Sequence, residues 1–319
     1  MSSSTPINIL CATDNGYAPY CGVMLTSLLE SNKESCVRVF VFVDEGLSPV
    51  NRKKFEGLAS RYGCSVIVRT VDDSLLEGFP VYKTSHVITL PTYYRLLAAK
   101  LLPEDVRRVI YLDCDIIVKG SLKPLWEMDL EGKVIAGVRD SGIHFRELLF
   151  EELGYPTSWG YFNAGVLMID LDAWRTQDID QQIHSFIEEN GHLLSYMDQD
   201  ALNGVLFERK LFLPERFNFQ TLSLLRKVWK IYPEAFRISL MHEKQNATVI
   251  HFSDISKPWN LINVGTPFQA EWDKYRKISG WNCPMLLLPI KKSLKQSVKR
   301  FLFPGLWEKK LKMIWVTSL

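Results

Sequence analysis

The sequence predicts an α/β protein with a mostly parallel sheet flanked by helices. Short apolar runs alternate with amphipathic helical segments through the first third of the chain. One apolar run near the middle ends in two carboxylates separated by a single residue, as strands of open α/β sheets do where they meet a ligand. The 319 residues, 47% hydrophobic and 23% charged, are sufficient for a full core.

The first third reads in order as strand, helix, strand, helix and strand. Residues 7–12, 37–43 and 65–68 are short runs rich in β-forming side chains. Between them, residues 20–31 and 48–62 carry apolar positions at helical spacing. This βαβ order predicts parallel strands with helices on both faces of the sheet.

The rest of the chain continues the alternation. Later strands are expected at 107–112, 134–138, 163–171 and 248–250, and later helices at 92–101, 145–153, 178–190 and 199–207. We find no internal repeat and no linker rich in Gly, Ser or Pro. A single catalytic domain over 5–282, followed by a tail over 283–319, is therefore predicted.

Charge is distributed unevenly along the chain. Residues 291–319 carry eight of the 38 basic residues and one of the 36 acidic residues, a net +7, which leaves −5 on the rest of a chain whose total is +2. This argues against a nucleic-acid-binding face on the main body and indicates a basic tail with its own partner.

The tail combines apolar and basic side chains at helical spacing. Its apolar positions include Leu294, Val298, Phe301 and Leu302, and its basic positions include Lys291, Lys295, Lys299 and Arg300. Such segments lie flat on anionic bilayers, so we expect peripheral attachment to the inner face of the cytoplasmic membrane. The alternative is a helix packed on the body with solvated lysines.

The cysteines and the N-terminus favour a cytoplasmic location. The six cysteines show no paired zinc spacing, and several lie in apolar runs, as reduced buried thiols do. The first residues lack a basic and apolar signal, and no apolar run reaches the ~20 residues of a membrane helix.

A metal-diphosphate site is predicted at the end of the strand over 107–112. Asp113 and Asp115 occupy positions i and i+2, whose side chains point the same way from a strand. Hard oxygen ligands suit Mn²⁺ or Mg²⁺, and a site with one or two carboxylates usually shares its ion with phosphates. The alternative is a solvated turn after the strand.

The first strand ends in Ala12-Thr13-Asp14-Asn15-Gly16-Tyr17, where a nucleoside would lie in such a sheet. Asp14 is suited to accept a hydrogen bond from a base imide, and Tyr17 to stack on the ring. An ordinary Asp-Asn-Gly turn is the alternative. The segment has no dinucleotide-binding or P-loop pattern, so those classes lack support.

Two later segments, around Asn163 and at Asp198–Asp200, add candidate ligand groups. Small residues around Asn163 let the backbone approach a ligand, and its amide suits a sugar hydroxyl. Asp198, Gln199 and Asp200 open a helix, where acidic residues also occur as caps.

His251 follows a predicted strand, a position where a lone histidine is more often structural than a ligand. Six residues later, Lys257 supplies a positive charge suited to a diphosphate.

Six motifs occur in order between residues 7 and 259. They read Ala-Thr-Asp-Asn-Gly-Tyr, Pro-Thr-Tyr-Tyr-Arg-Leu, Tyr-Leu-Asp-Cys-Asp-Ile-Ile-Val, Phe-Asn-Ala-Gly-Val-Leu-Met-Ile-Asp, Asp-Gln-Asp-Ala-Leu-Asn and His-Phe-Ser-Asp-Ile-Ser-Lys-Pro-Trp. Together they resemble glycosyltransferase family eight, the retaining GT-A enzymes typified by bacterial lipopolysaccharide galactosyl- and glucosyltransferases.

The resemblance implies a GT-A fold and transfer of galactose or glucose from a UDP-sugar to a hydroxyl of a glycan or glycolipid acceptor, with Mn²⁺ or Mg²⁺ as cofactor. It implies metal ligands at Asp113, Asp115 and His251, a nucleotide side with Ala12, Asp14, Tyr17 and Lys257, and a donor-sugar side with Arg95, Asn163, Ala164, Asp198 and Gln199, with Asp140 close by. Gly16 and Asp254 depart from the family pattern, and Asp254 would repel phosphate unless turned away.

Gln199 would be the residue nearest to the nucleophile position, and a poorly nucleophilic amide favours front-face substitution. A double displacement would need Asp140 or Asp198 behind the anomeric carbon. Two other functions stay open within the resemblance: a self-glucosylating primer protein and a sugar-nucleotide-binding module without transfer. A sugar nucleotidyltransferase is disfavoured, because the first loop is not rich in Gly, Arg and Lys.

Overall fold

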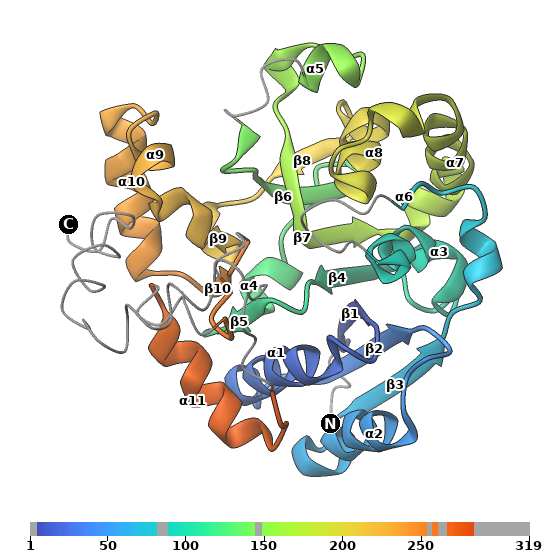
Figure 1. The fold of residues 1–319 in the computed structure, drawn as a ribbon, viewed down its shortest axis with the longest axis vertical. Coiled ribbons are helices and arrows are strands. Elements are labelled where there is room, and N and C mark those ends of the chain that lie inside the picture. Colours follow the sequence, from blue (N-terminus) through green and yellow to red (C-terminus); the bar gives the residue numbers. More distant parts are fainter. Residues whose placement is uncertain (1–4, 82–88, 144–148, 254–256, 261–266, 284–319) are drawn as a thin grey trace, which may run out of the picture.

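The computed structural model describes residues 5–81, 89–143, 149–253, 257–260 and 267–283 (Figure 1). The basic tail beyond residue 283, Asp254 and the first part of the helix expected at 145–153 lie outside the described residues.

The first third of the chain folds as predicted. It forms β1 (Ile7–Thr13), α1 (Ala18–Ser31), β2 (Val37–Val43), α2 (Pro49–Tyr62) and β3 (Ser65–Thr70). Local signals explain the bounds of α2. The Ser48 side chain accepts a hydrogen bond from the backbone of Asn51, Pro49 occupies the first turn, and Gly63 ends the helix with φ 62°.

The remaining elements alternate short helices and strands. They are the 3₁₀ turn η1 (Asp73–Leu76), η2 (Leu90–Leu97), α3 (Ala98–Leu101), β4 (Arg108–Leu112), β5 (Ile116–Val118), α4 (Lys123–Trp126), β6 (Ile135–Arg139), α5 (Leu149–Glu152), η4 (Thr157–Trp159), β7 (Phe162–Asp170), α6 (Leu171–Thr176), α7 (Ile179–Asn190), η5 (Gly191–Leu193), α8 (Met197–Leu206), β8 (Lys210–Phe212), η6 (Glu215–Phe217), β9 (Phe219–Gln220), η7 (Thr221–Leu224), α9 (Arg226–Trp229), α10 (Glu234–Gln245), β10 (Val249–His251) and α11 (Gln269–Ser279).

The segment expected to be helical over 92–101 is helical, although it is not one continuous α-helix. The segment is a 3₁₀ helix, η2, that continues into the single turn α3. Five consecutive residues from Tyr93 to Leu97 are buried, so packing surrounds the segment instead of favouring one helical face. Tertiary contacts therefore decide its geometry over helix propensity.

The main sheet has seven strands in the order β3-β2-β1-β4-β7-β6-β8. The pairs β3-β2, β2-β1, β1-β4 and β6-β8 are parallel, which confirms the predicted mostly parallel sheet. Strand β7 runs antiparallel to both β4 and β6. Its first residues therefore lie at the edge of the sheet where β1 and β4 end (Figure 1).

A second sheet of three strands, β5-β10-β9, was not predicted. Antiparallel pairing places His251 of β10 opposite Ile116 of β5, directly after Asp115. This small sheet therefore brings a late segment of the chain to the carboxylates that follow β4.

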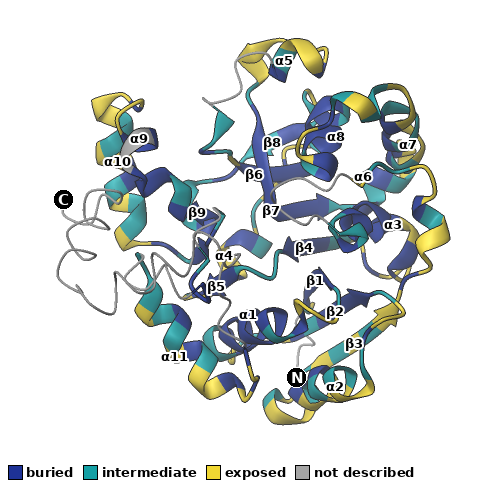
Figure 2. Ribbon diagram, viewed as in Figure 1, coloured by how far each residue is buried: buried dark blue, intermediate teal, exposed yellow. Residues whose placement is uncertain are grey.

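Alternate residues of the strands feed two cores, one on each face of the main sheet. One core contains α1, α2 and α11 together with the small sheet, and the other contains η2, α3, α6, α7 and α8. Figure 2 shows the central strands of the main sheet buried between exposed outer surfaces of the helices, whereas the edge strand β3 is partly exposed. Within the described residues, no helix is both long and apolar enough to cross a membrane.

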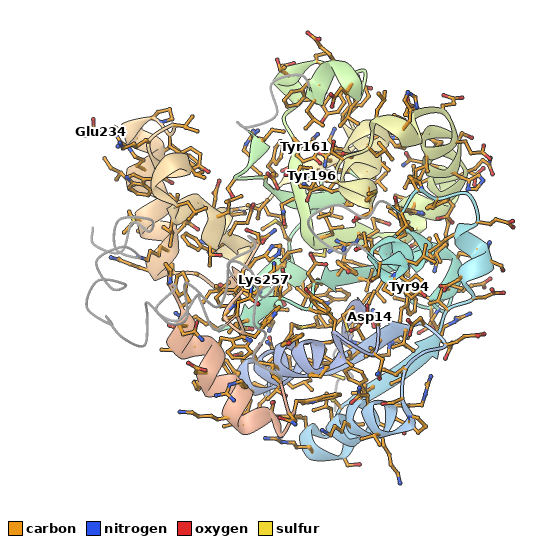
Figure 3. All side chains as sticks on the ribbon, viewed as in Figure 1. Asp14, Tyr94, Tyr161, Tyr196, Glu234 and Lys257 are labelled. Carbon is orange, nitrogen blue, oxygen red and sulfur yellow. The ribbon has the colours of Figure 1, made fainter. Side chains whose placement is uncertain are left out.

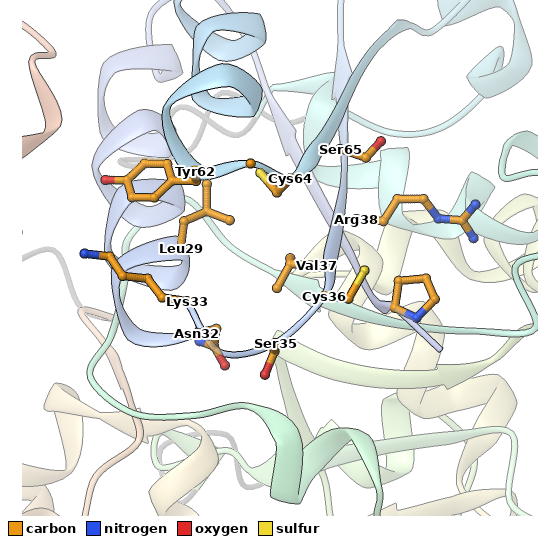
Figure 4. A pocket seen from close by; sticks show the side chains of 12 residues that line it. Leu29, Asn32, Lys33, Ser35, Cys36, Val37, Arg38, Tyr62, Cys64 and Ser65 are labelled. Carbon is orange, nitrogen blue, oxygen red and sulfur yellow. The ribbon is translucent and has the colours of Figure 1, made fainter. Parts of the chain in front are cut away.

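A hollow of about 260 Å³ lies at the amino ends of β2 and β3 (Figure 4). Its lining includes Leu29, Cys36, Tyr62 and Cys64, and no carboxylate occurs among the described residues that line it. The candidate chemistry lies at the opposite edge of the sheet.

Candidate active site

Carboxylates and an imidazole converge beyond the carboxyl end of β4. Ligand atoms of Asp113, Asp115 and His251 all lie within 4.8 Å of one another. Nε2 of His251 is 3.2 Å from Oδ1 of Asp115 and 3.9 Å from Oδ2 of Asp113. The structure thus brings together the three residues that the sequence had suggested as metal ligands.

The electrostatics of this cluster suit a cation. Although burial alone would raise the pKa of the Asp115 carboxyl, Lys257 and His251 outweigh burial and hold it well below its usual range. The amine of Lys257 donates a hydrogen bond to Oδ2 of Asp115. Two carboxylates facing one imidazole nitrogen repel unless a proton or a cation lies between them, and this set of oxygen and nitrogen donors fits Mn²⁺ or Mg²⁺.

The predicted nucleotide side lines a cavity of about 190 Å³ between the ends of β1 and β4. Ala12, Asp14 and Tyr17 contribute to its wall, as do Arg95 and Asp113. Asp14 and Lys257 are labelled in Figure 3 and extend from the segments after β1 and β10.

Asp14 also organises its own turn. One carboxylate oxygen accepts the backbone N–H of Tyr17 at 2.7 Å, and the other accepts the hydroxyl of Thr89 at 3.2 Å. Tyr17 is 41% exposed, and its ring packs edge-on against Tyr20 and Trp259. A Cβ at Gly16 would lie 3.3 Å from Oδ1 of Asp14, a tight contact with the carboxylate that organises this turn.

Arg95 joins the metal side to the predicted donor-sugar side. This buried guanidinium donates to Oδ1 of Asp113 at 2.8 Å and to the backbone oxygen of Ala164. Burial alone would lower the pKa of Arg95, but Asp113 and Asp198 outweigh it and raise that pKa.

Asp198 is buried beside Arg95. Its Oδ2 lies 3.0 Å from Nε of Arg95, but that N–H donates to the backbone oxygen of Thr92. Among the described residues, Oδ2 of Asp198 is buried without a hydrogen-bond partner. Burial raises the pKa of Asp198 to about 7, with Arg95 opposing the shift.

Gln199 is held in one orientation. Its Oε1 accepts the backbone N–H of Ala164 at 2.8 Å and Nδ2 of Asn163 at 3.2 Å. Its Nε2 donates to the hydroxyl of Tyr161 at 3.1 Å and to Oδ2 of Asp140 at 3.3 Å. Both acceptor positions of the amide oxygen are therefore occupied.

The two carboxylates of the Asp-Gln-Asp segment have different surroundings. Asp200 accepts the backbone N–H groups of Ser195 and Tyr196 at 2.8 and 2.7 Å, so it orders the start of α8. Asp198 instead faces Arg95. Capping thus accounts for Asp200 and leaves Asp198 to the site.

Sequence reasoning missed several buried polar residues that support the site. Asn218 contacts His251 and Asn163. Gln220 bonds backbone groups on both sides of Asp140, namely the oxygen of Arg139 and the N–H of Ser141. The only available signal was two amides alternating with aromatic residues in Phe217-Asn218-Phe219-Gln220.

Comparison with known proteins identifies the family. The profile of Glycosyl transferase family 8 matches residues 8–263, most of the chain. The chain is a family 8 glycosyltransferase. The resemblance that the six motifs had suggested is thereby confirmed.

Named relatives of this family 8 glycosyltransferase include bacterial proteins of similar length. General stress protein A of Bacillus subtilis is 33% identical over 86% of this chain and 94% of its own. Lipopolysaccharide 1,3-galactosyltransferase of Salmonella typhimurium is 27% identical over 91% of this chain and 83% of its own.

The galactosyltransferase LgtC, solved with donor and acceptor sugar analogs, has the same architecture as this family 8 glycosyltransferase. It superposes with a TM-score of 0.74 at 25% identity, covering 91% of this chain and all of that one. The predicted GT-A fold is therefore confirmed.

Proposed function

We propose that this glycosyltransferase moves galactose or glucose from a UDP-sugar to a hydroxyl of a glycan acceptor, with retention at the anomeric carbon and with Mn²⁺ or Mg²⁺ bound. One observation carries the proposal: the Asp113, Asp115 and His251 cluster and the Gln199 amide network occupy the same edge of the sheet, linked through Arg95. A diphosphate on the cluster would bring its sugar towards that network.

The metal cluster and Lys257 form the proposed leaving-group site. A divalent cation held by the three ligands would neutralise charge that develops on the diphosphate. Lys257 supplies a further positive charge beside Asp115, and both contributions are largest when the bond to the sugar breaks. Asp14 and Tyr17 would hold the uracil ring of the donor.

The environment of Gln199 favours front-face substitution. Because both lone pairs of its oxygen accept hydrogen bonds, an attack on the sugar would break the bonds to Ala164 and Asn163. We infer that the acceptor hydroxyl enters from the side that UDP leaves, and that a phosphate oxygen takes its proton. Gln199 and Asp198 would stabilise the positive charge on the sugar in this oxocarbenium-like state, and Asp140 would orient Gln199.

Double displacement is the competing mechanism, with Asp140 or Asp198 as nucleophile. Oδ2 of Asp198 accepts no hydrogen bond among the described residues, whereas Oδ2 of Asp140 accepts hydrogen bonds from Asn163 and Gln199. Mass spectrometry of enzyme quenched during turnover would reveal a glycosyl adduct on either carboxylate and overturn the front-face route.

We also propose a lipopolysaccharide or another cell-surface glycolipid as acceptor. The name of the Salmonella relative and the basic, aromatic composition of residues 283–319 support this substrate class. A basic amphipathic tail would hold the enzyme at the inner face of the cytoplasmic membrane, where each Lys or Arg near anionic lipid contributes ~1 kcal/mol.

The deciding experiment is a UDP-release screen with Mn²⁺ over UDP-glucose, UDP-galactose, UDP-galacturonate and UDP-N-acetylhexosamines. Slow hydrolysis of UDP-glucose or UDP-galactose alone is the expected result, and release from neither refutes the donor assignment. A rise in intact mass with UDP-glucose would indicate a self-glucosylating primer protein instead. Donor binding without any UDP release would indicate a binding module.

A further inference from the structure

The hydrogen-bond network around Asn163 has a fixed direction, because a backbone N–H can only donate. The N–H of Gly165 donates to one side-chain atom of Asn163 at 3.0 Å, so that atom is the amide oxygen Oδ1. The Nδ2 group of Asn163 must then donate to its other neighbours, Oδ2 of Asp140 at 3.0 Å and Oε1 of Gln199 at 3.2 Å.

The same reasoning orients Asn218 and His251. Asn218 contacts Oδ1 of Asn163 at 2.9 Å, so it presents Nδ2 to that oxygen. Its own oxygen therefore faces Nδ1 of His251, also at 2.9 Å. Two acceptors cannot form a hydrogen bond, so Nδ1 of His251 carries a proton and Nε2 is the nitrogen presented to the carboxylates.

Burial makes this arrangement sensitive to change. Asn218, Asn163 and His251 are 1%, 8% and 3% exposed. Without the Asn218 side chain, the N–H of His251 would lose its partner where water has little access. Histidines that bind metals usually donate their other ring N–H to a fixed acceptor, which orients the ring.

We propose that Asn218 is a positioning residue that holds His251 with Nε2 towards the metal cluster and links this ring, through Asn163, to Asp140 on the donor-sugar side. The assignment rests on the proposed metal-dependent function. Asn218 contacts the cluster through Nδ1 of His251, not through the nitrogen that faces the carboxylates, and it acts through His251 and Asn163.

Two substitutions separate the bond of Asn218 to His251 from its bond to Asn163. Asn218→Ala removes both bonds, so the affinity for Mn²⁺ should fall ~10–100-fold. Asn218→Asp keeps an acceptor for His251 but replaces the donor that faces Asn163. Its affinity for Mn²⁺ should stay within a few-fold of wild type while kcat falls ~10-fold or more. Calorimetric titration of the full chain with Mn²⁺, with UDP present, measures the affinity for Mn²⁺ independently of turnover.

Nitrogen NMR of the histidine rings tests the tautomer directly. In metal-free wild type at alkaline pH, the ring of His251 should carry its proton on Nδ1, and in Asn218→Ala it should shift towards the Nε2-protonated form. The resonance is assigned by its loss in His251→Ala. Asn32→Ala is the matched control, because Asn32 is another buried amide whose bonds go to Leu28 and Leu122. It should lower stability without changing either readout.

An unchanged affinity for Mn²⁺ in Asn218→Ala, or a wild-type His251 protonated on Nε2 alone, overturns the proposal. If Asn218→Ala fails to fold, the wild-type spectrum and Asn218→Asp still decide it. A wild type that binds no Mn²⁺ but shows the Nδ1 proton refutes metal-dependent transfer while supporting the positioning of His251 by Asn218.

Discussion

Gly165 is the position where a single methyl group should disable the site. An ideal Cβ there would lie 2.2 Å from Cε1 of His251 and 2.9 Å from Oδ2 of Asp113. Carbon atoms in contact are ~3.5–4.0 Å apart, so the imidazole ring or the strand must move by more than ~1 Å. Overpacking of this kind costs ~1–3 kcal/mol, and a displacement of ~1 Å at reacting groups can cost ~100-fold in rate.

Gly165→Ala should therefore stay folded while turnover falls ~100-fold and Mn²⁺ binds more weakly. UDP release under saturating donor and calorimetric Mn²⁺ titration measure the two effects. Gly57→Ala is the control, because a Cβ there meets nothing within 4 Å and the residue lies in α2. It should keep full activity and gain ~0.5–1 kcal/mol in stability. Wild-type turnover and Mn²⁺ affinity in Gly165→Ala would refute the steric argument.

Four further outcomes are expected. Alanine at Asp113 or Asp115 should lower turnover at least ~100-fold, and undiminished wild-type turnover in EDTA would refute the metal role. Gln199→Ala should lower kcat more than it raises the donor KM; weaker donor binding at unchanged kcat would reassign it to positioning. Burial lowers the pKa of Lys210 from 10.5 to about 7, so the unfolded chain binds more protons between these values. Wild type should then gain ~1–3 kcal/mol over Lys210→Met from pH 7 to 9 in urea unfolding, and parallel pH profiles would contradict this. A chain ending at residue 289 should keep donor hydrolysis and lose sedimentation with anionic vesicles; vesicle binding that survives, or that the full chain never shows, removes the membrane hypothesis.

The sequence predicted the longer strands, because their apolar pattern extends over several residues. Strands β1 to β4 are apolar runs of five to seven residues, long enough to show periodicity, and the candidate residues follow directly after strands. The direction of β7 in the sheet could not be predicted, because side chains alternate between the two faces of a sheet in the same way in parallel and antiparallel strands. Strands β5 and β9 have only three and two residues, too few for a pattern; β10 was expected at 248–250, but its pairing with β5 and β9 was not.

The sequence did not reveal the buried residues that support the site, for a related reason. Asn218 is an amide between two phenylalanines, and its role depends on the pairing of β9 with β10. No local pattern encodes that pairing. Conversely, the resemblance placed Asp198 and Arg95 in one group, and their side chains lie 3.0 Å apart; spacing alone could not distinguish Asp198 from Asp200.

The small sheet completes the proposed metal site with a residue that is synthesised late. His251 follows Asp115 by 136 residues, and only the pairing of β10 with β5 brings them together. At ~5–20 residues per second, roughly 7–27 s separate the two ligands during translation. A nascent chain thus contains both carboxylates well before the histidine is synthesised. We expect ribosome-bound chains that end before β10 to bind the donor poorly, so the enzyme becomes active only when synthesis of its body is nearly complete.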